Sequence, residues 1–208
     1  FNMLDDLVMP GPTKNKIALE IKKLDSLPEG HPERAIVQNY LDTILSLPWN
    51  KTGVEELDLD KVKKALSKSH YGLENVKSRI LEYVALKRRN PNVKSPILCL
   101  VGAPGVGKTS ISIAIANALN REFYKLSVGG LNDVTELMGS RRTYLGSNMG
   151  KIMQAIKKCQ VKNPVILLDE IDKMVKNYNG DPASALLEIV DPEQNYLFTD
   201  NYLEEPFD

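Results

Sequence analysis

The sequence predicts an α/β fold with a parallel sheet, preceded by an all-helical segment. Apolar residues recur at helical spacing through the first 90 positions, which is typical of amphipathic helices. Short, continuously apolar runs stand at 96–101 and 165–168, and such runs are typical of strands buried on both faces. Helical stretches alternate with these runs, and that alternation is typical of a parallel sheet.

The first two helices are predicted over 14–27 and 32–47. Apolar residues line one face of each, namely Ile17, Ile21 and Leu24 in the first and Ile36, Tyr40, Ile44 and Leu47 in the second. Pro32 suits the first turn of a helix, and Pro48 ends the second one. Trp49 is the only tryptophan, and we expect it to pack where the helical segment meets the next part of the chain.

Two further helices are predicted over 59–68 and 73–89. Asp58 stands where an N-cap residue is expected, and Val62 and Leu66 lie beyond it at helical spacing. Asn90 precedes a proline, which ends the second of these helices. The pattern then changes at position 95. We expect a buried strand at 96–101, a helix at 108–120, and further strands at 122–127 and 165–168.

Composition and charge exclude several classes of protein. The chain has 208 residues, 42% of them hydrophobic, which is enough for a folded core and argues against disorder. Its 27 basic and 27 acidic residues balance, which argues against a dedicated nucleic-acid binder while leaving a local basic patch open. Two cysteines are too few for a disulfide framework and favour a reducing compartment. No apolar run approaches the roughly 20 residues that span a bilayer, so we expect no membrane partner.

A glycine-rich loop carries the strongest chemical signal. Gly102-Ala103-Pro104-Gly105-Val106-Gly107-Lys108-Thr109 fits G-x-x-x-x-G-K-[ST] in full, between a predicted strand and a predicted helix. Glycines let successive backbone N–H groups point at phosphate oxygens, and the helix N-terminus adds its positive dipole end. We expect Lys108 to reach the β- and γ-phosphates of a nucleotide and the Thr109 hydroxyl to bind Mg²⁺.

An acidic pair stands directly after the apolar run at 165–168. Ligands of open α/β sheets bind at the carboxyl ends of strands, where Asp169 and Glu170 stand. We expect Asp169 to hold Mg²⁺, directly or through water, and Glu170 to orient and activate the attacking water. With Lys108 they form the predicted catalytic set. An adjacent Asp and Glu favour ATP hydrolysis over phosphotransfer, which must exclude water. The sequence holds no guanine-reading N-K-x-D.

Beyond these motifs, the sequence resembles the ATPase part of Lon-type ATP-dependent proteases, in the AAA+ superfamily. The segments that carry the resemblance are 47–50, 70–73, 80–83, 141–146, 168–174, 180–188 and 191–195. It extends from about position 28 to position 208. The resemblance implies a P-loop AAA+ core of three layers, with ATP or ADP and Mg²⁺ as ligands. Residues 1–57 are then a helical N-terminal segment, and 58–208 are a large nucleotide-binding subdomain, incomplete at its C-terminus.

The resemblance also implies roles for single residues. His70 and Tyr71 border the adenine, and Ser110 belongs to the nucleotide site. Tyr144 and Leu145 form the loop that grips substrate in the central pore. Many family members carry Met-Pro-Gly where this chain has Asn148-Met149-Gly150, and losing the proline is expected to make the loop less stiff.

Other assignments stay open at the sequence level. Arg141 and Arg142 either contact a neighbouring subunit or line a solvated loop. Residues 198–202 are a candidate second substrate-facing loop.

The whole protein implied by the resemblance is a homohexamer that unfolds damaged or unfolded proteins and threads them to a serine peptidase. Its sensor residue, arginine finger, lid and Ser–Lys peptidase are expected beyond position 208, so residues 1–208 alone should show weak or no ATPase activity and no proteolysis. The bacterial cytoplasm and the mitochondrial matrix both fit. The alternative is a non-proteolytic AAA+ remodeller. A weak DNA contact through Arg88-Arg89 and Lys157-Lys158 is a third possibility, set against the simpler interpretation of solvated helix faces.

Overall fold

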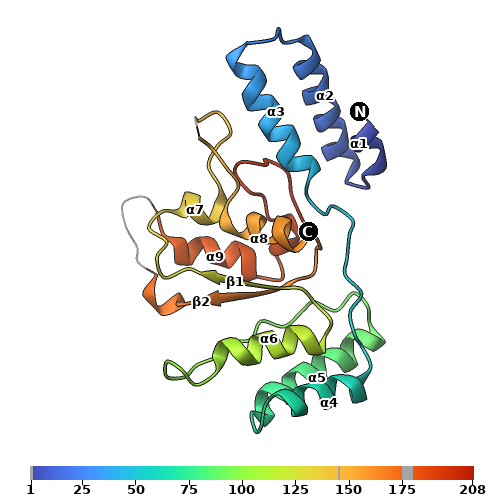
Figure 1. Cartoon of the computed structure of the whole chain (residues 1–208), viewed down its shortest axis with the longest axis vertical. Coiled ribbons are helices and arrows are strands. Elements are labelled where there is room, and N and C mark those ends of the chain that lie inside the picture. The colour runs from blue at the N-terminus through green and yellow to red at the C-terminus, as the bar shows by residue number, and fades with distance from the viewer. Residues whose placement is uncertain (1, 145, 175–179) are drawn as a thin grey trace. The chain divides into compact units, whose positions relative to one another are not determined.

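The computed structural model of the chain describes residues 2–144, 146–174 and 180–208 (Figure 1). Contacts divide the chain into two compact units. The first unit comprises Phe1–Thr52, Ser127–Lys162 and Asp169–Asp208. The second comprises Gly53–Leu126 and Asn163–Leu168. The predicted boundary between 57 and 58 stays a prediction, as does the three-layer arrangement of the core.

The first unit is mostly helical. Its elements are α1 (Asn2–Asp6), α2 (Gly11–Ser26), α3 (Pro32–Leu45), α7 (Val134–Met138), α8 (Lys151–Cys159), the 3₁₀ turn η1 (Ile171–Lys173), α9 (Pro182–Val190) and the 3₁₀ turn η2 (Asn195–Leu197). Helices α2 and α3 correspond to those predicted at 14–27 and 32–47, and they pack against each other. The turn between them is fixed because the Arg34 guanidinium donates to the carbonyl oxygens of Leu24 and Leu27, at 3.0 and 2.6 Å.

The hairpin of α2 and α3 is joined to the C-terminal segment by buried contacts. Trp49 donates from Nε1 to the Ile44 carbonyl at 2.8 Å, and its ring lies 5.1 Å from that of Phe207. The buried Tyr40 hydroxyl donates to the Leu203 carbonyl at 2.7 Å. Trp49 therefore packs where the helical segment meets later residues, as predicted.

The second unit holds α4 (Leu59–Ser69), α5 (Glu74–Arg89) and α6 (Lys108–Ala118) (Figure 1). These three helices share one hydrophobic core. Its most buried members are Val62, Leu66, Ile80, Val84, Ile111 and Ile115. Asp58 caps α4 by accepting from the backbone N–H groups of Asp60 and Lys61, at 3.0 and 3.2 Å. The sequence therefore predicted these helices, and this cap, correctly.

Two of the predicted strands form, and they pair in parallel: β1 (Phe123–Ser127) with β2 (Val165–Asp169). Their last residues, Ser127 and Asp169, belong to the first unit, and the rest of each strand belongs to the second. β2 is half-buried along its length rather than fully buried.

The strand predicted at 96–101 does not form, and that prediction was wrong. Leu98 and Leu100 pack against the helical core of the second unit, but Ile97 and Val101 are 61% and 93% exposed. A strand needs the N–H and C=O groups of a neighbouring strand, and within the described residues β1 and β2 pair only with each other. The apolar run is therefore covered on one face instead of two.

The described helices answer two questions that the sequence raises: whether a helix could cross a membrane, and where the predicted basic pairs lie. In the part of the chain described here, every helix is too short or too polar to cross a membrane. Arg88-Arg89 and Lys157-Lys158 occupy the last turns of α5 and α8, where cations offset the negative end of the helix dipole. This placement gives both pairs a structural role, and a DNA contact through them stays a prediction.

Candidate functional site

The glycine-rich loop at 102–107 curls as its sequence predicts. Gly105 and Gly107 have φ angles of +81° and +91°, which residues with a Cβ rarely adopt. Gly107 is also the N-cap of α6, so the loop leads directly into a helix N-terminus. A Cβ on Gly102 would lie 2.9 Å from Cγ2 of Val106. The glycines at 102, 105 and 107 are therefore each required by backbone shape or by space.

Lys108 opens α6 and folds back over its own loop. Its ammonium group donates to the carbonyl oxygens of Gly102 and Ala103, the latter at 3.2 Å. Residues 102–106, including Pro104, are exposed, and Lys108 and Thr109 are half-buried. The loop therefore presents its backbone outward, with a lysine cation across it and a threonine hydroxyl one residue later.

His70 reaches the same turn from the end of α4. Its Nε2 lies 3.0 Å from the Ser110 hydroxyl, which itself donates to the Gly107 carbonyl at 2.9 Å. The direction of the hydrogen bond between Ser110 and Nε2 depends on the tautomer of His70. Nδ1 of His70 is buried with no hydrogen-bond partner.

Tyr71 and Lys77 complete the surroundings of His70. The Tyr71 side chain is fully exposed beside Gly72, which has a φ of +74°. The buried Lys77 on α5 donates to the His70 carbonyl at 2.7 Å and fixes this turn. The structure thus places His70 against Ser110, leaves Tyr71 in solvent, and adds Lys77.

The acidic pair stands at the carboxyl end of β2, as predicted. Asp169 accepts from the Glu170 N–H at 2.9 Å, and Glu170 has the left-handed φ of +62°. The Glu170 carboxylate accepts from the Ser127 hydroxyl at 3.2 Å and pairs with the Lys173 ammonium at 2.9 Å. Two side chains therefore hold a carboxylate that is otherwise open to solvent.

Electrostatics keep Glu170 ionised. The Lys173 hydrogen bond and charge, followed by the Ser127 hydroxyl, lower the pKa of Glu170, and the Asp169 charge opposes them. Gly129 makes room for this arrangement, because a Cβ there would lie 2.8 Å from the Glu170 Cβ and 3.0 Å from the Lys173 Cβ. These three partners, Ser127, Gly129 and Lys173, were not predicted. The spacing of three residues between Glu170 and Lys173 was a usable signal, whereas contacts of 127 and 129 with 170 depend on strand pairing.

The oxygen donors suit Mg²⁺. Thr109 offers a hydroxyl and Asp169 a carboxylate, the hard ligands that Mg²⁺ prefers. Within the described ranges, no group of three or more His, Cys, Asp or Glu residues could hold a metal.

The loop at 139–150 has a closed stem and an exposed tip. The Ser140 N–H donates to the Asn148 carbonyl, and the Asn148 N–H to the Ser140 hydroxyl, both at 3.2 Å. Tyr144 stands at the tip with 63% of its side chain exposed. Leu145 lies outside the described residues. The Met149 N–H, which a proline would lack, is held by the Asn148 side chain at 2.8 Å.

Arg142 and the segment 198–202 differ from the sequence expectations. Arg142 pairs with Glu20 of the same chain at 2.9 Å, while Arg141 is exposed. The prediction of a second substrate-facing loop at 198–202 is wrong for its aromatic side chains, because Phe198 and Tyr202 are 7% and 4% exposed. These rings pack inward and are not presented to a substrate.

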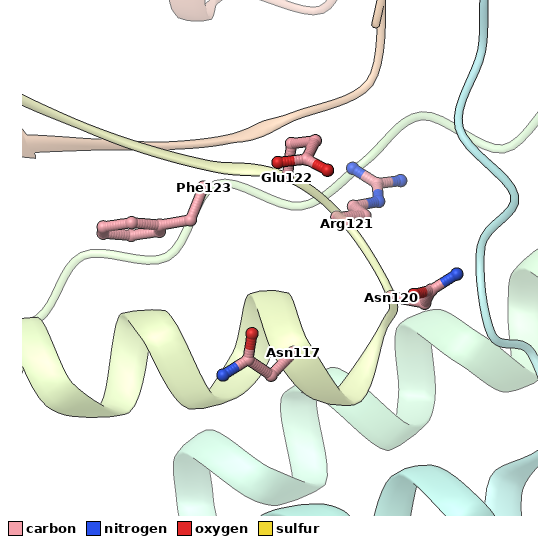
Figure 2. A pocket seen from close by; sticks show the side chains of 5 residues that line it. All are labelled: Asn117, Asn120, Arg121, Glu122 and Phe123. Atoms are coloured by element: carbon pink, nitrogen blue, oxygen red, sulfur yellow. The ribbon is translucent and has the colours of Figure 1, made fainter.

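A cavity of about 350 Å³ lies elsewhere, around the turn between α6 and β1 (Figure 2). It is lined by Asn117, Asn120, Arg121, Glu122 and Phe123. This turn stands at the far end of α6 from Lys108, about 16 Å along the helix. Arg121 is committed there to an ion pair with Glu55 at 2.8 Å and a hydrogen bond to the Tyr83 hydroxyl at 2.6 Å. The cavity is therefore separate from the glycine-rich loop.

The chain is similar in sequence to known proteins. It is 54% identical to the Lon protease of Halothermothrix orenii over 207 residues, which cover 100% of the chain and 26% of that protein. Identity to the Lon protease of Clostridioides difficile is also 54%, covering 99% and 26%. Lon protease 1 of Thermus thermophilus is 50% identical, covering 96% and 26%. The chain thus spans about a quarter of the length of these relatives.

A family profile places the chain more broadly. The profile described as "ATPase family associated with various cellular activities (AAA)" matches residues 98–202, which is half of the chain. That range contains the glycine-rich loop, Lys108, Thr109 and the Asp169-Glu170 pair. The chain therefore belongs to the AAA family of ATPases, which bind nucleotide.

Proposed function

We propose that the chain is the ATP-binding and ATP-hydrolysing part of a Lon-type protease, which unfolds substrate proteins and passes them to a peptidase elsewhere in the protein. The observation that carries the proposal is the glycine-rich loop, complete in sequence and curled into the N-terminus of α6. About half of all residues are identical to Lon proteases along nearly the whole chain, which supports the specific family.

Nucleotide binding is a consequence of the loop. The exposed backbone of the loop and the dipole of α6 attract phosphate. Lys108 exchanges the carbonyl oxygens of Gly102 and Ala103 for phosphate oxygens, and the charge-assisted bonds it gains are stronger than those it gives up. His70 and Tyr71 border the base, and His70 is linked to Ser110 in the first turn of α6.

Hydrolysis requires an oriented water molecule and neutralised phosphate charge. Thr109 and Asp169 would hold Mg²⁺, which supplies charge neutralisation when bound. Glu170 orients the attacking water and accepts a proton from it as a general base. It is suited to this role because Lys173 and Ser127 keep its carboxylate ionised. Lys108 stabilises the charge that develops on the transferred phosphoryl group.

In this proposal, the tip of the loop at 139–150 contacts the substrate. Tyr144 and Leu145 form the proposed grip, because a large apolar surface can hold any passing side chain without reading its sequence. The proposed assembly is a homohexamer in the bacterial cytoplasm or the mitochondrial matrix, acting on unfolded or damaged proteins.

Glu170→Gln tests the hydrolytic role in the full-length protein. The amide cannot take up a proton from water, so we expect ATP binding to persist and hydrolysis to fall by at least about 100-fold. Nucleotide retention and phosphate release are the measurements. The control is Glu188→Gln, the same change at an exposed position on α9. Hydrolysis by Glu170→Gln at the rate of this control would overturn the assignment.

The alternative is a non-proteolytic AAA+ remodeller. ATP-dependent degradation of an unfolded protein by the full-length protein supports the Lon assignment. Unfolding without peptide release supports the remodeller. A weak DNA contact through the basic pairs at 88–89 and 157–158 predicts an affinity that falls steeply with salt concentration.

A further inference from the structure

One arginine ties the tip of the loop at 139–150 to the N-terminal helices. The Arg142 guanidinium pairs with Glu20 of α2 at 2.9 Å and with Glu204 at 3.4 Å. Its central carbon lies 4.4 Å from the centre of the Tyr40 ring on α3. A side chain two positions from Tyr144 therefore bridges to both helices of the hairpin.

The partners of Arg142 are themselves fixed. The Tyr40 side chain is 1% exposed and is held by its hydrogen bond to the Leu203 carbonyl. The Glu20 and Arg142 side chains are 14% and 21% exposed. Burial lowers the pKa of Arg142, but its hydrogen bond to Glu20 and the charges of Glu20 and Glu204 outweigh that effect. The guanidinium therefore stays charged within a partly buried set of contacts, which strengthens its ion pairs.

A second anchor holds the two ends of the loop. The buried Asp200 accepts from the Gly150 N–H at 2.7 Å and from the Tyr202 N–H at 2.8 Å. A Cβ on Gly139 would lie 2.5 Å from the Asp200 carboxylate, so the opposite end of the loop packs directly on it. Asp200 thus fixes where the loop begins and ends, and Arg142 fixes one side of its tip.

We propose that Arg142 is a positioning residue that passes the load on the Tyr144 loop into the helices α2 and α3. This inference rests on the proposed gripping role of Tyr144. A folded substrate resists being pulled, whereas an unfolded one does not. Loss of the Arg142 bridge should therefore impair work on folded substrates selectively, because a tip held only at its base yields under load.

Arg142→Gln in the full-length protein tests this. We expect ATP hydrolysis and degradation of an unfolded protein to stay within about twofold, while degradation of a stably folded protein falls about five- to tenfold. Glu20→Gln should reproduce the loss in part. The double variant should be no worse than Arg142→Gln, since the two substitutions act on the same bridge. The matched control is Arg141→Gln, the neighbouring arginine, which is exposed.

The outcomes separate the inference from the proposed function. If Tyr144→Ala processes folded substrates normally, the gripping role itself fails. If Tyr144→Ala is defective while Arg142→Gln behaves like Arg141→Gln, only the bridge is refuted. Equal losses on folded and unfolded substrates also refute it, because they indicate general destabilisation. Should Arg142→Gln not fold, Glu20→Gln tests the bridge instead, by the ratio of folded-substrate to unfolded-substrate degradation. This variant leaves Arg142 in contact with Glu204 and Tyr40.

Discussion

The pair of Glu170 and Lys173 shows how one residue sets the chemistry of another. Their side chains meet at 2.9 Å because three residues of a 3₁₀ turn bring them to one face. Glu170 must be ionised to draw a proton from water, and the Lys173 cation lowers its pKa. Lys173 therefore widens the pH range over which the proposed base can act.

Removing that cation should change the pH dependence of hydrolysis. In Lys173→Met the pKa of Glu170 rises, so the acid limb of the rate–pH profile should move to higher pH. The shift should shrink as salt is added, because the pair is exposed and screened. Steady-state ATP hydrolysis by the full-length protein across pH is the measurement, with Lys173→Arg as the charge-preserving control. An acid limb that stays in place would show that Lys173 does not tune Glu170.

Residues whose role depends on a local pattern were predictable, and those that depend on chain pairing were not. The glycines at 102, 105 and 107 are fixed by a contiguous motif, and the structure gives the last two the positive φ angles that it needs. Ser127 reaches Glu170 only because β1 lies beside β2, and no local signal in the sequence specifies that neighbour. Arg142 is similar, since its partner Glu20 is 122 residues away.

The same distinction holds for whole elements. Helices form from hydrogen bonds within themselves, so spacing and caps such as Asp58 suffice to predict them. A strand needs a partner elsewhere in the chain. The run at 96–101 has strand composition, but only its Leu98 and Leu100 pack against the helical core, and it forms no ladder within the described residues. Its apolar composition predicted burial on both faces, and the structure partly buries one of them.

The stem of the loop at 139–150 is the element most sensitive to added volume. A Cβ on Gly150 would lie 2.0 Å from the Leu137 carbonyl oxygen and 2.6 Å from the Gly139 nitrogen, both backbone atoms. We expect Gly150→Ala to lower the free energy of unfolding by about 1–3 kcal/mol. Gly11→Ala is the control, since a Cβ there meets nothing within 4 Å. Chemical denaturation measures both, and equal stabilities would contradict the tight stem.

At the scale of the whole molecule, the N-terminal helices group with residues 127–162 and 169–208. Trp49 packs on Phe207, and Tyr40 contacts Tyr202 with ring centres 5.9 Å apart. The Thr13 hydroxyl donates to the buried Glu205 carboxylate at 2.8 Å. The division into 1–57 and 58–208 follows from the family resemblance, and a resemblance between local segments carries no information on which distant residues pack together.

Deleting residues 1–52 tests whether the N-terminal helices fold as a separate part or only together with residues 127–162 and 169–208. The deletion leaves Gly53–Asp208, including the ion pair of Glu55 with Arg121, but removes Trp49 and Tyr40. Phe207, Tyr202 and Leu203 would then be exposed, at a cost of about 1.5–3 kcal/mol for each side chain. That sum is comparable with the whole stability of a typical domain.

We therefore expect the shortened chain to lose cooperative thermal unfolding by circular dichroism and to bind a hydrophobic dye. Leu19→Ala, at a position on α2 that is 66% exposed, should leave the melting of the intact chain unchanged. A shortened chain that melts cooperatively at the temperature of the intact one would instead establish the helices as a separable domain. In that case the Arg142 bridge would join two independently folded parts, and its loss would weaken their coupling without destabilising either.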